Sequence, residues 1–142
     1  MSSAIMRGRS FAVSLALIGV TMVAGVAIRF VPLGLPHVVV KYGGSMLWAV
    51  MIYWIVSALL PTRTPFAVSF LAAGVATAVE FLKLFHTPAF DAFRLTLPGI
   101  LVLGRFFSVW DIVAYWLAIA VAAVIDFRIR DLPVEEPGHA SL

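Results

Sequence analysis

The 142-residue sequence contains no cysteine and few charged residues. Without cysteine, the chain can form no disulfide bond and offers no thiolate for catalysis or metal binding. Charged residues make up only 12% of the chain and hydrophobic residues 63%, whereas soluble domains carry roughly 25% charged residues. Because so few polar side chains could not cover a soluble surface, the composition predicts an integral membrane protein with one domain.

The signatures of several functional classes are also missing. Histidines and acidic residues do not occur at the spacings of metal sites, such as HxxxH or HExxH, so we expect no metal and no cofactor. The net charge is only +3 and the basic residues are scattered, unlike the clustered charge of a nucleic-acid-binding surface. We therefore expect membrane lipids, and no nucleic acid, as partners.

Four apolar runs predict an all-α membrane protein with transmembrane helices at about residues 10–28, 42–60, 65–85 and 106–125. About 20 apolar residues span a hydrocarbon core of roughly 30 Å. The first run could instead be a cleavable signal peptide, but it exceeds the usual apolar region of about 7–15 residues. The four-helix domain would cover residues 10–126, between a short N-terminal arm (1–9) and a polar C-terminal tail (127–142).

The segment between the third and fourth predicted helices, residues 86–105, is too broken to cross a membrane. Pro88, Pro98 and Gly99 divide it into short pieces. Non-helical backbone at membrane depth is tolerated only where protein or a wet cavity covers it. We therefore predict an interfacial or re-entrant segment that packs on the bundle.

Four spans place both termini on one side of the membrane. Arg7 and Arg9 flank the first span, and the first helix usually dominates orientation, with basic residues on the cytoplasmic side. We therefore expect cytoplasmic termini.

Many ionisable residues would lie at the membrane face opposite the termini. Such groups are costly in or beside hydrocarbon, which makes them a functional-site hypothesis. Glu80 and Asp111 each end a helical row of small residues and should face the bundle interior, with Arg94, Arg105 or Lys41 as partners. The candidate ligand-binding site or buried polar network comprises Arg29, Lys41, Glu80, Lys83, His86, Asp91, Arg94, Arg105, Asp111 and Tyr115.

Structural interpretations of the same residues are also open. Lys41 and Lys83 could extend their ammonium groups to lipid headgroups. Asp91 and Arg94, three residues apart, could form a local salt bridge that fixes the loop. Arg105 could contact lipid phosphates. The cluster is therefore either a structural network or a binding or catalytic site.

One pattern of residues resembles a known family. It consists of the run KYGGSMLWA at Lys41–Ala49, Glu80, Arg94 with Thr96, Leu103-Gly104 before Phe106 or Phe107, and Asp111 with Tyr115. Over about residues 29–119 the chain resembles a small bacterial membrane family of unknown function. That family is similar in pattern to the VanZ-like proteins, one of which is linked to teicoplanin resistance. Lys83 stands where the family pattern has glutamine. The resemblance implies a location in the bacterial inner membrane and no particular reaction.

Three functions fit the candidate site. The preferred hypothesis is binding or exclusion of an amphipathic ligand (a lipid, a lipid-linked envelope precursor or a lipophilic antibiotic), with its anionic group held by a cationic rim of Arg29, Lys41, Arg94 and Arg105. The second is a structural or accessory subunit with a membrane-protein partner, or a homo-oligomer. The third is an intramembrane lipid enzyme, with Glu80 or Asp111 as general base and Arg94 stabilising negative charge.

Overall fold

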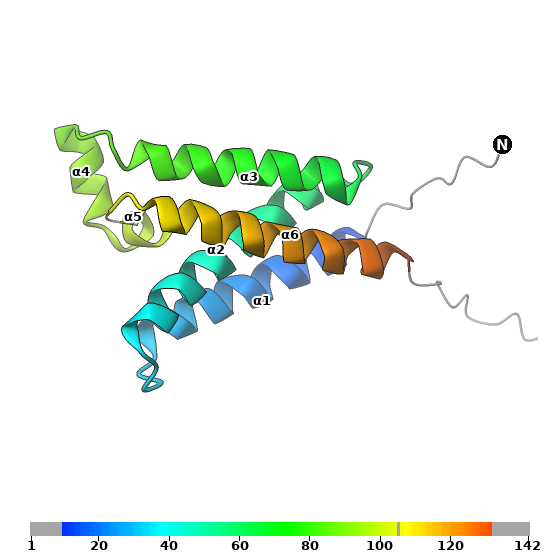
Figure 1. The fold of residues 1–142 in the computed structure, drawn as a ribbon, viewed down its shortest axis with the longest axis horizontal. Helices are drawn as coiled ribbons and strands as arrows, with labels where there is room; N and C mark the ends of the chain where they lie inside the picture. Colours follow the sequence, from blue (N-terminus) through cyan, green and yellow to red (C-terminus); the bar gives the residue numbers. More distant parts are fainter. Residues whose placement is uncertain (1–9, 105, 132–142) are drawn as a thin grey trace, which may run out of the picture.

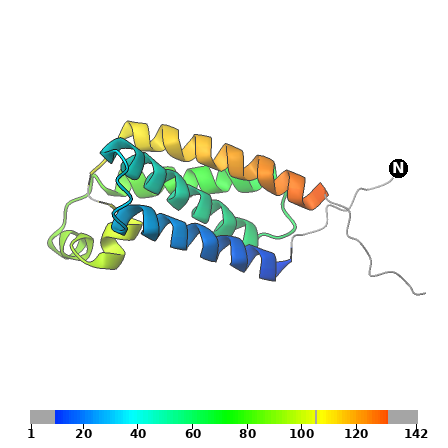
Figure 2. The ribbon, with the colours of Figure 1, turned by 90° about the horizontal axis from the view of Figure 1, so that it is seen from below.

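A computed structural model of the chain describes residues 10–104 and 106–131, in which helices joined by short connections make up the regular secondary structure (Figures 1 and 2). The residues of the N-terminal arm (1–9), Arg105 and the tail from residue 132 lie outside this description. The prediction of an all-α protein is confirmed. The helices, in chain order, are α1 (Phe11–Phe30), α2 (His37–Leu59), α3 (Pro65–Leu82), α4 (Pro88–Arg94), α5 (Leu97–Val102) and α6 (Val109–Asp131).

Helices α1, α2, α3 and α6 are each long and apolar enough to cross a membrane. Two of them begin at side-chain caps: the hydroxyl of Ser10 accepts from the N–H of Val13, and that of Thr64 accepts from the N–H of Ala67. Such caps satisfy backbone donors that have no partner within the helix. Helices α2 and α3 pack against each other across the short turn at residues 60–64.

Two helix boundaries differ from the predicted spans by more than three residues. Helix α2 begins at His37, ahead of predicted residue 42, with Pro36 as its N-cap; the preset φ of proline suits this position. Helix α6 ends at Asp131, beyond predicted residue 125. An ion pair between Asp126 and Arg130, four residues apart, lies on its last turns. Such pairs stabilise a helix, so α6 continues through polar residues that we assigned to the tail.

Helix α2 lies at the centre of the bundle and packs against α1, α3 and α6, and α3 also packs against α6. The core between them contains several alanines, including Ala49, Ala72, Ala76, Ala118 and Ala122. Small side chains let helices approach closely, which matters because lipid supplies no hydrophobic drive for helix association. Within the described part of the chain, α1 packs against α2 alone.

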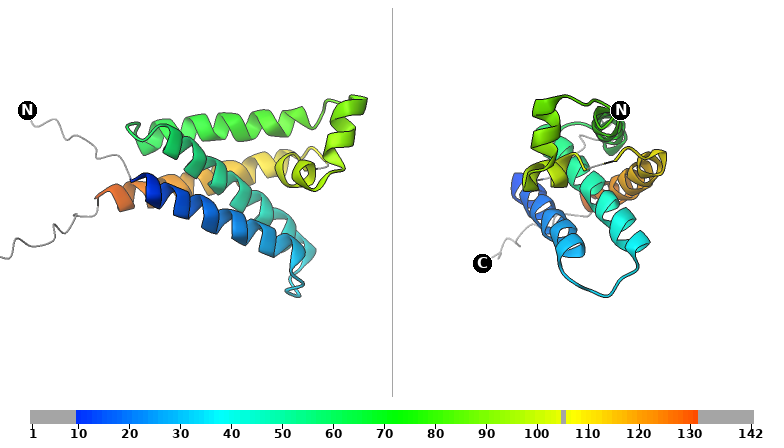
Figure 3. Two further views of the ribbon diagram at one scale, coloured as in Figure 1. Left: turned by 180° about the vertical axis from the view of Figure 1, so that it is seen from behind. Right: turned by 90° about the vertical axis from the view of Figure 1, so that its left-hand side faces the viewer.

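The predicted broken segment forms the two short helices α4 and α5, at the end of the bundle remote from the termini (Figures 1 and 3). Each helix begins with a threonine whose hydroxyl accepts a backbone N–H, Thr87 for α4 and Thr96 for α5. A proline follows in the first turn of each helix, where its missing N–H costs nothing. Threonine–proline caps therefore start both short helices.

The turn between α4 and α5 depends on Gly99. A Cβ atom built on Gly99 would lie 1.9 Å from the carbonyl oxygen of Phe93 and 2.9 Å from the Cα of Arg94. Backbone atoms cannot yield as a flexible side chain can. Only glycine therefore allows α5 to start so close to the end of α4.

We predict that Gly99→Ala lowers the free energy of unfolding by about 1–3 kcal/mol, because its methyl group overpacks the α4–α5 junction. Thermal unfolding in a mild detergent measures this loss. Gly74→Ala is the matched control, since Gly74 is also helical but has open space around its Cβ position. Equal midpoints for the two variants would contradict the proposed contact.

Candidate functional site

Glu80, in the last turn of α3, is completely buried and has three donors. The ammonium of Lys83 lies 2.5 Å from Oε2. The hydroxyl of Tyr115 donates to the same oxygen over 2.8 Å, and the backbone N–H of Ser108 donates to Oε1 over 2.8 Å. A buried carboxylate is tolerated only when it is paired and hydrogen-bonded. This cluster therefore ties the end of α3 to the start of α6.

Lys83 does not extend to the membrane surface, as one interpretation of the sequence suggested, and is only 7% exposed. The turn after α5 passes close to its side chain. Gly104 in this turn has φ +67°, and a Cβ at this position would lie 3.3 Å from Nζ of Lys83. Glu80 is thus partnered by Lys83, and Arg94 and Lys41 are not the partners that we expected.

A cavity of about 520 Å³ lies beside this cluster. Residues from the end of α1, the first turns of α2, the α5–α6 connection and the start of α6 form its wall. The polar part of the wall consists of Arg29, His37, Lys41, Ser45, Lys83, Ser108, Asp111 and Tyr115. Lys41 and His37 are exposed at its rim, and Asp111 and Tyr115 are buried.

Asp111 lines this cavity from the first turn of α6 and is 4% exposed. The hydroxyl of Ser45 donates to its Oδ1 over 3.4 Å, which is a long hydrogen bond. Within the part of the chain that the structure describes, Asp111 forms no ion pair. Unlike Glu80, it therefore retains the capacity to accept a hydrogen bond from something in the cavity.

Two cations in the cavity wall have no anionic partner among the described residues. Arg29, in the last turn of α1, packs against α2 at Gly44, where a Cβ would lie 2.9 Å from Nε of the arginine. Lys41 places Nζ 5.1 Å from the ring centre of Tyr42. Arg29 and Lys41 are therefore available to bind an anion.

A second cavity of about 330 Å³ lies between α1, α2 and α5 and is almost entirely apolar. It shares four wall residues with the polar cavity: Arg29, Trp48, Leu101 and Val102. The indole N–H of Trp48 is buried and has no hydrogen-bond partner in the described chain. The two cavities are therefore neighbours, with a cation and an aromatic ring at their junction.

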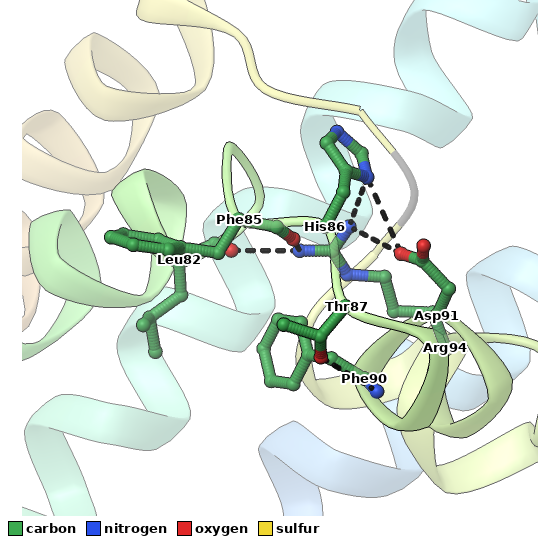
Figure 4. Close-up of polar contacts among 7 residues, drawn as sticks. All are labelled: Leu82, Phe85, His86, Thr87, Phe90, Asp91 and Arg94. Carbon is green, nitrogen blue, oxygen red and sulfur yellow. Dashed lines mark hydrogen bonds and ion pairs between the residues drawn. The ribbon is translucent and has the colours of Figure 1, made fainter.

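Arg94 belongs to a separate cluster at the end of α3 and is 6% exposed (Figure 4). Its Nη2 donates to the carbonyl oxygens of Leu82 and Phe85, over 2.7 and 2.9 Å. The last carbonyls of a helix have no partners within the helix and carry partial negative charge, which favours a cation. Our expectation that Arg94 pairs with Glu80 or Asp111 is therefore corrected: in the described chain it caps α3.

His86 and Asp91 complete the Arg94 cluster. Nη1 of Arg94 lies 3.4 Å from Oδ1 of Asp91 and 3.4 Å from Nδ1 of His86, so the expected i,i+3 ion pair is present. The guanidinium also stacks 4.5 Å from the ring centre of Phe90. His86 is exposed and Asp91 is about half exposed, and neither lines the polar cavity.

A second buried network, which the sequence analysis did not identify, lies at the end of the bundle near the termini. Asp126 accepts from the hydroxyl of Tyr53 over 2.7 Å and from that of Ser57 over 3.4 Å. Nε of Arg130 donates to the same carboxylate over 3.0 Å, and its Nη1 donates to the carbonyl of Arg63 over 2.7 Å. This network fastens the end of α6 to α2 and to the α2–α3 turn.

The sequence did contain a signal for Asp126. The row of Asp111, Tyr115, Ala118 and Ala122 continues to residue 126 at the next step of four. Because the predicted fourth span ends at residue 125, this row did not include Asp126. No comparable signal existed for Ser45 or Trp48, because their roles depend on contacts with other helices.

The structure therefore divides the predicted site residues into two groups. Those at the polar cavity or in its wall are Arg29, Lys41, Glu80, Lys83, Asp111 and Tyr115. His86, Asp91 and Arg94 form the cap of α3, and Arg105 lies outside the described residues. In residues 10–104 and 106–131, no three histidine or acidic side chains are placed to hold a metal ion.

These features define a small multi-pass α-helical membrane protein with a polar cavity at one end. Residues 34–119, more than half of the chain, match DUF2809, a family described as a protein of unknown function. The chain belongs to this family. The match covers nearly the stretch over which we noted a resemblance, but nothing ties it to the VanZ-like proteins. No solved structure matches the chain.

We predict that Glu80→Gln destabilises the protein by about 3–5 kcal/mol, because it leaves the buried ammonium of Lys83 without a counter-charge. The midpoint of thermal unfolding in detergent tests this. The double variant Glu80→Gln/Lys83→Met removes both charges and should recover most of the loss. If the single and double variants were equally unstable, the ion pair would not be the cause.

We predict that Arg94→Lys lowers stability by about 1–3 kcal/mol, since lysine cannot donate from one planar group to two carbonyls while it contacts Asp91. Thermal unfolding again provides the measure. The amount of any co-purifying lipid per folded protein should not change. A selective loss of lipid with unchanged stability would instead make Arg94 a ligand-binding residue.

Proposed function

We propose that this protein binds an amphipathic ligand, with the anionic headgroup in the polar cavity and the apolar chain in the neighbouring apolar cavity. The observation that carries this proposal is the shared wall at Arg29, Trp48, Leu101 and Val102. A polar and an apolar compartment that meet at a cation match the structure of a lipid at the point where its headgroup joins its chains.

The charges in the polar cavity support an anionic headgroup. Arg29 and Lys41 have no anionic partner among the described residues, whereas Lys83 is neutralised by Glu80. Arginine binds phosphate or carboxylate through two parallel hydrogen bonds, and such bonds are among the stronger ones in proteins. A phosphate or carboxylate of the ligand would therefore supply the negative charge that no described protein group provides to Arg29 and Lys41.

The apolar cavity supports a hydrocarbon chain as the other part of the ligand. Met22 and Val26 on α1 and Val102 on α5 line it and are also exposed on the outside of the protein. Helices α1 and α5 do not pack directly against each other. A chain could therefore enter between them from the surrounding bilayer, without leaving the hydrocarbon.

Several ligand classes share this design: a membrane lipid, a lipid-linked envelope precursor or a lipophilic antibiotic. In the orientation that the sequence favours, the termini lie in the cytoplasm of a bacterium and the polar cavity lies at the outer face of the inner membrane. The protein would then hold or exclude its ligand at that face.

We predict that Arg29→Gln/Lys41→Gln reduces co-purifying lipid at least about tenfold, because both unpaired cations are removed. Purification in a mild detergent followed by lipid mass spectrometry measures the amount per folded protein. Arg63→Gln/Arg128→Gln is the matched control, since it removes two exposed cations near the other end of the bundle.

Equal lipid retention in both double variants would contradict the proposal. The accessory-subunit hypothesis would then gain support if cross-linking in membranes captured a specific partner protein.

A further inference from the structure

We propose that the headgroup bound in the polar cavity is a phosphodiester that also carries a hydrogen-bond donor, either a hydroxyl or an ammonium. This inference rests on the proposed function. The phosphate would bind Arg29 and Lys41, and the donor would bind Asp111. The structure supports it through the number of charges around the cavity and through the unusual position of Asp111.

The charges of the described residues favour a single negative charge on the ligand. Three cations, Arg29, Lys41 and Lys83, face two carboxylates, Glu80 and Asp111, which leaves one positive charge. A phosphodiester carries one negative charge, whereas a phosphomonoester carries about 1.5 to 2 at pH 7. A diester whose donor is a neutral hydroxyl therefore balances the site. A diester with an ammonium is neutral overall and would leave one positive charge, and a monoester would add excess negative charge beside a buried carboxylate.

Asp111 is the residue that requires a hydrogen-bond donor on the headgroup. Its carboxylate is 4% exposed, and in the described chain only the long bond from Ser45 reaches its Oδ1. Its Oδ2 has no hydrogen-bond partner there. This oxygen is not among the fully enclosed polar atoms and is open to the cavity. An ionised carboxylate only accepts hydrogen bonds, so a headgroup that fills the cavity without offering a donor would leave it unpaired, which is costly. A headgroup hydroxyl or ammonium would supply the missing bond.

The same carboxylate would select against headgroups without a donor. A trimethylammonium group has no N–H, so it would place methyl groups against Asp111 and leave the acceptor unsatisfied. Specificity that rests on a buried group left unpaired by the wrong ligand is stronger than specificity that rests on added apolar contact. The cavity would therefore distinguish two lipids that share the same phosphodiester.

The test is a headgroup series with identical short acyl chains, titrated into the full-length protein in nonionic detergent. Dihexanoyl phosphatidylglycerol offers hydroxyl donors, phosphatidylethanolamine an ammonium, and phosphatidylcholine no donor; phosphatidic acid is the monoester. We expect the first two to bind about tenfold more tightly than phosphatidylcholine, the value of one charge-assisted hydrogen bond. Phosphatidic acid should bind no more tightly than phosphatidylglycerol. Native mass spectrometry measures each dissociation constant.

The variant Asp111→Asn keeps the size of the side chain and removes its charge. It should reduce the preference for phosphatidylglycerol over phosphatidylcholine to about twofold or less. The series on the unaltered protein decides the question even if this variant fails to fold.

The outcomes separate the inference from the proposed function. Equal affinity for phosphatidylcholine and phosphatidylglycerol, with both weakened by Arg29→Gln, overturns the inference alone. Absence of binding for all four lipids overturns the proposed function. Glycerophosphoglycerol and glycerophosphoethanolamine, which lack acyl chains, test a free headgroup as the ligand. If they bound as tightly as the lipids, the apolar cavity would have no part in binding.

Discussion

The buried carboxylate of Glu80 is the constraint on which this end of the bundle depends. Its charge must be satisfied by the ammonium of Lys83, the N–H of Ser108 and the hydroxyl of Tyr115, because an unpaired buried charge costs several kcal/mol or more. These donors come from the end of α3, the residue before α6 and the second turn of α6. Forming these three contacts with Glu80 fixes the alignment of α3 and α6, and therefore the position of Asp111.

Polar clusters at both ends of the bundle enclose a middle built of small apolar residues. Lipid gives helices no hydrophobic reason to associate, so close packing and interhelical hydrogen bonds must hold them together. Asp126 serves this purpose near the termini through Tyr53, Ser57 and Arg130, and Glu80 serves it at the opposite end. The networks also specify which helices are neighbours, which alanine packing alone would leave less well defined.

The contacts of the α4–α5 segment show which cations stabilise the fold and which stay unpaired in the wall of the polar cavity. Nη2 of Arg94 donates to the carbonyl oxygens at the end of α3, and its buried Nε has no hydrogen-bond partner in the described chain. Helix α5, which follows Arg94 in the chain, contributes Leu101 and Val102 to both cavities. Arg29 and Lys41, in the wall of the polar cavity, have no anionic partner in the described chain. Arg94, which the sequence suggested as a site residue, thus contributes to the scaffold, and the cations that line the polar cavity without an anionic partner in the described chain come from α1 and α2.

The sequence by itself determined the membrane class, the four spanning helices, the broken segment and the inward orientation of Glu80 and Asp111. Composition and helical periodicity depend only on residue types and on neighbours along one helix. The tertiary structure alone decided that Lys83 pairs with Glu80, that Arg94 caps α3, and that Ser45 and Trp48 line the cavity beside Asp111. Glu80 and Lys83 are only three residues apart, so the sequence allowed their pairing, and the packing that buries Lys83 decided it over an exposed position. The other contacts join segments that are apart in the sequence, and only the packed backbone sets the distances between them.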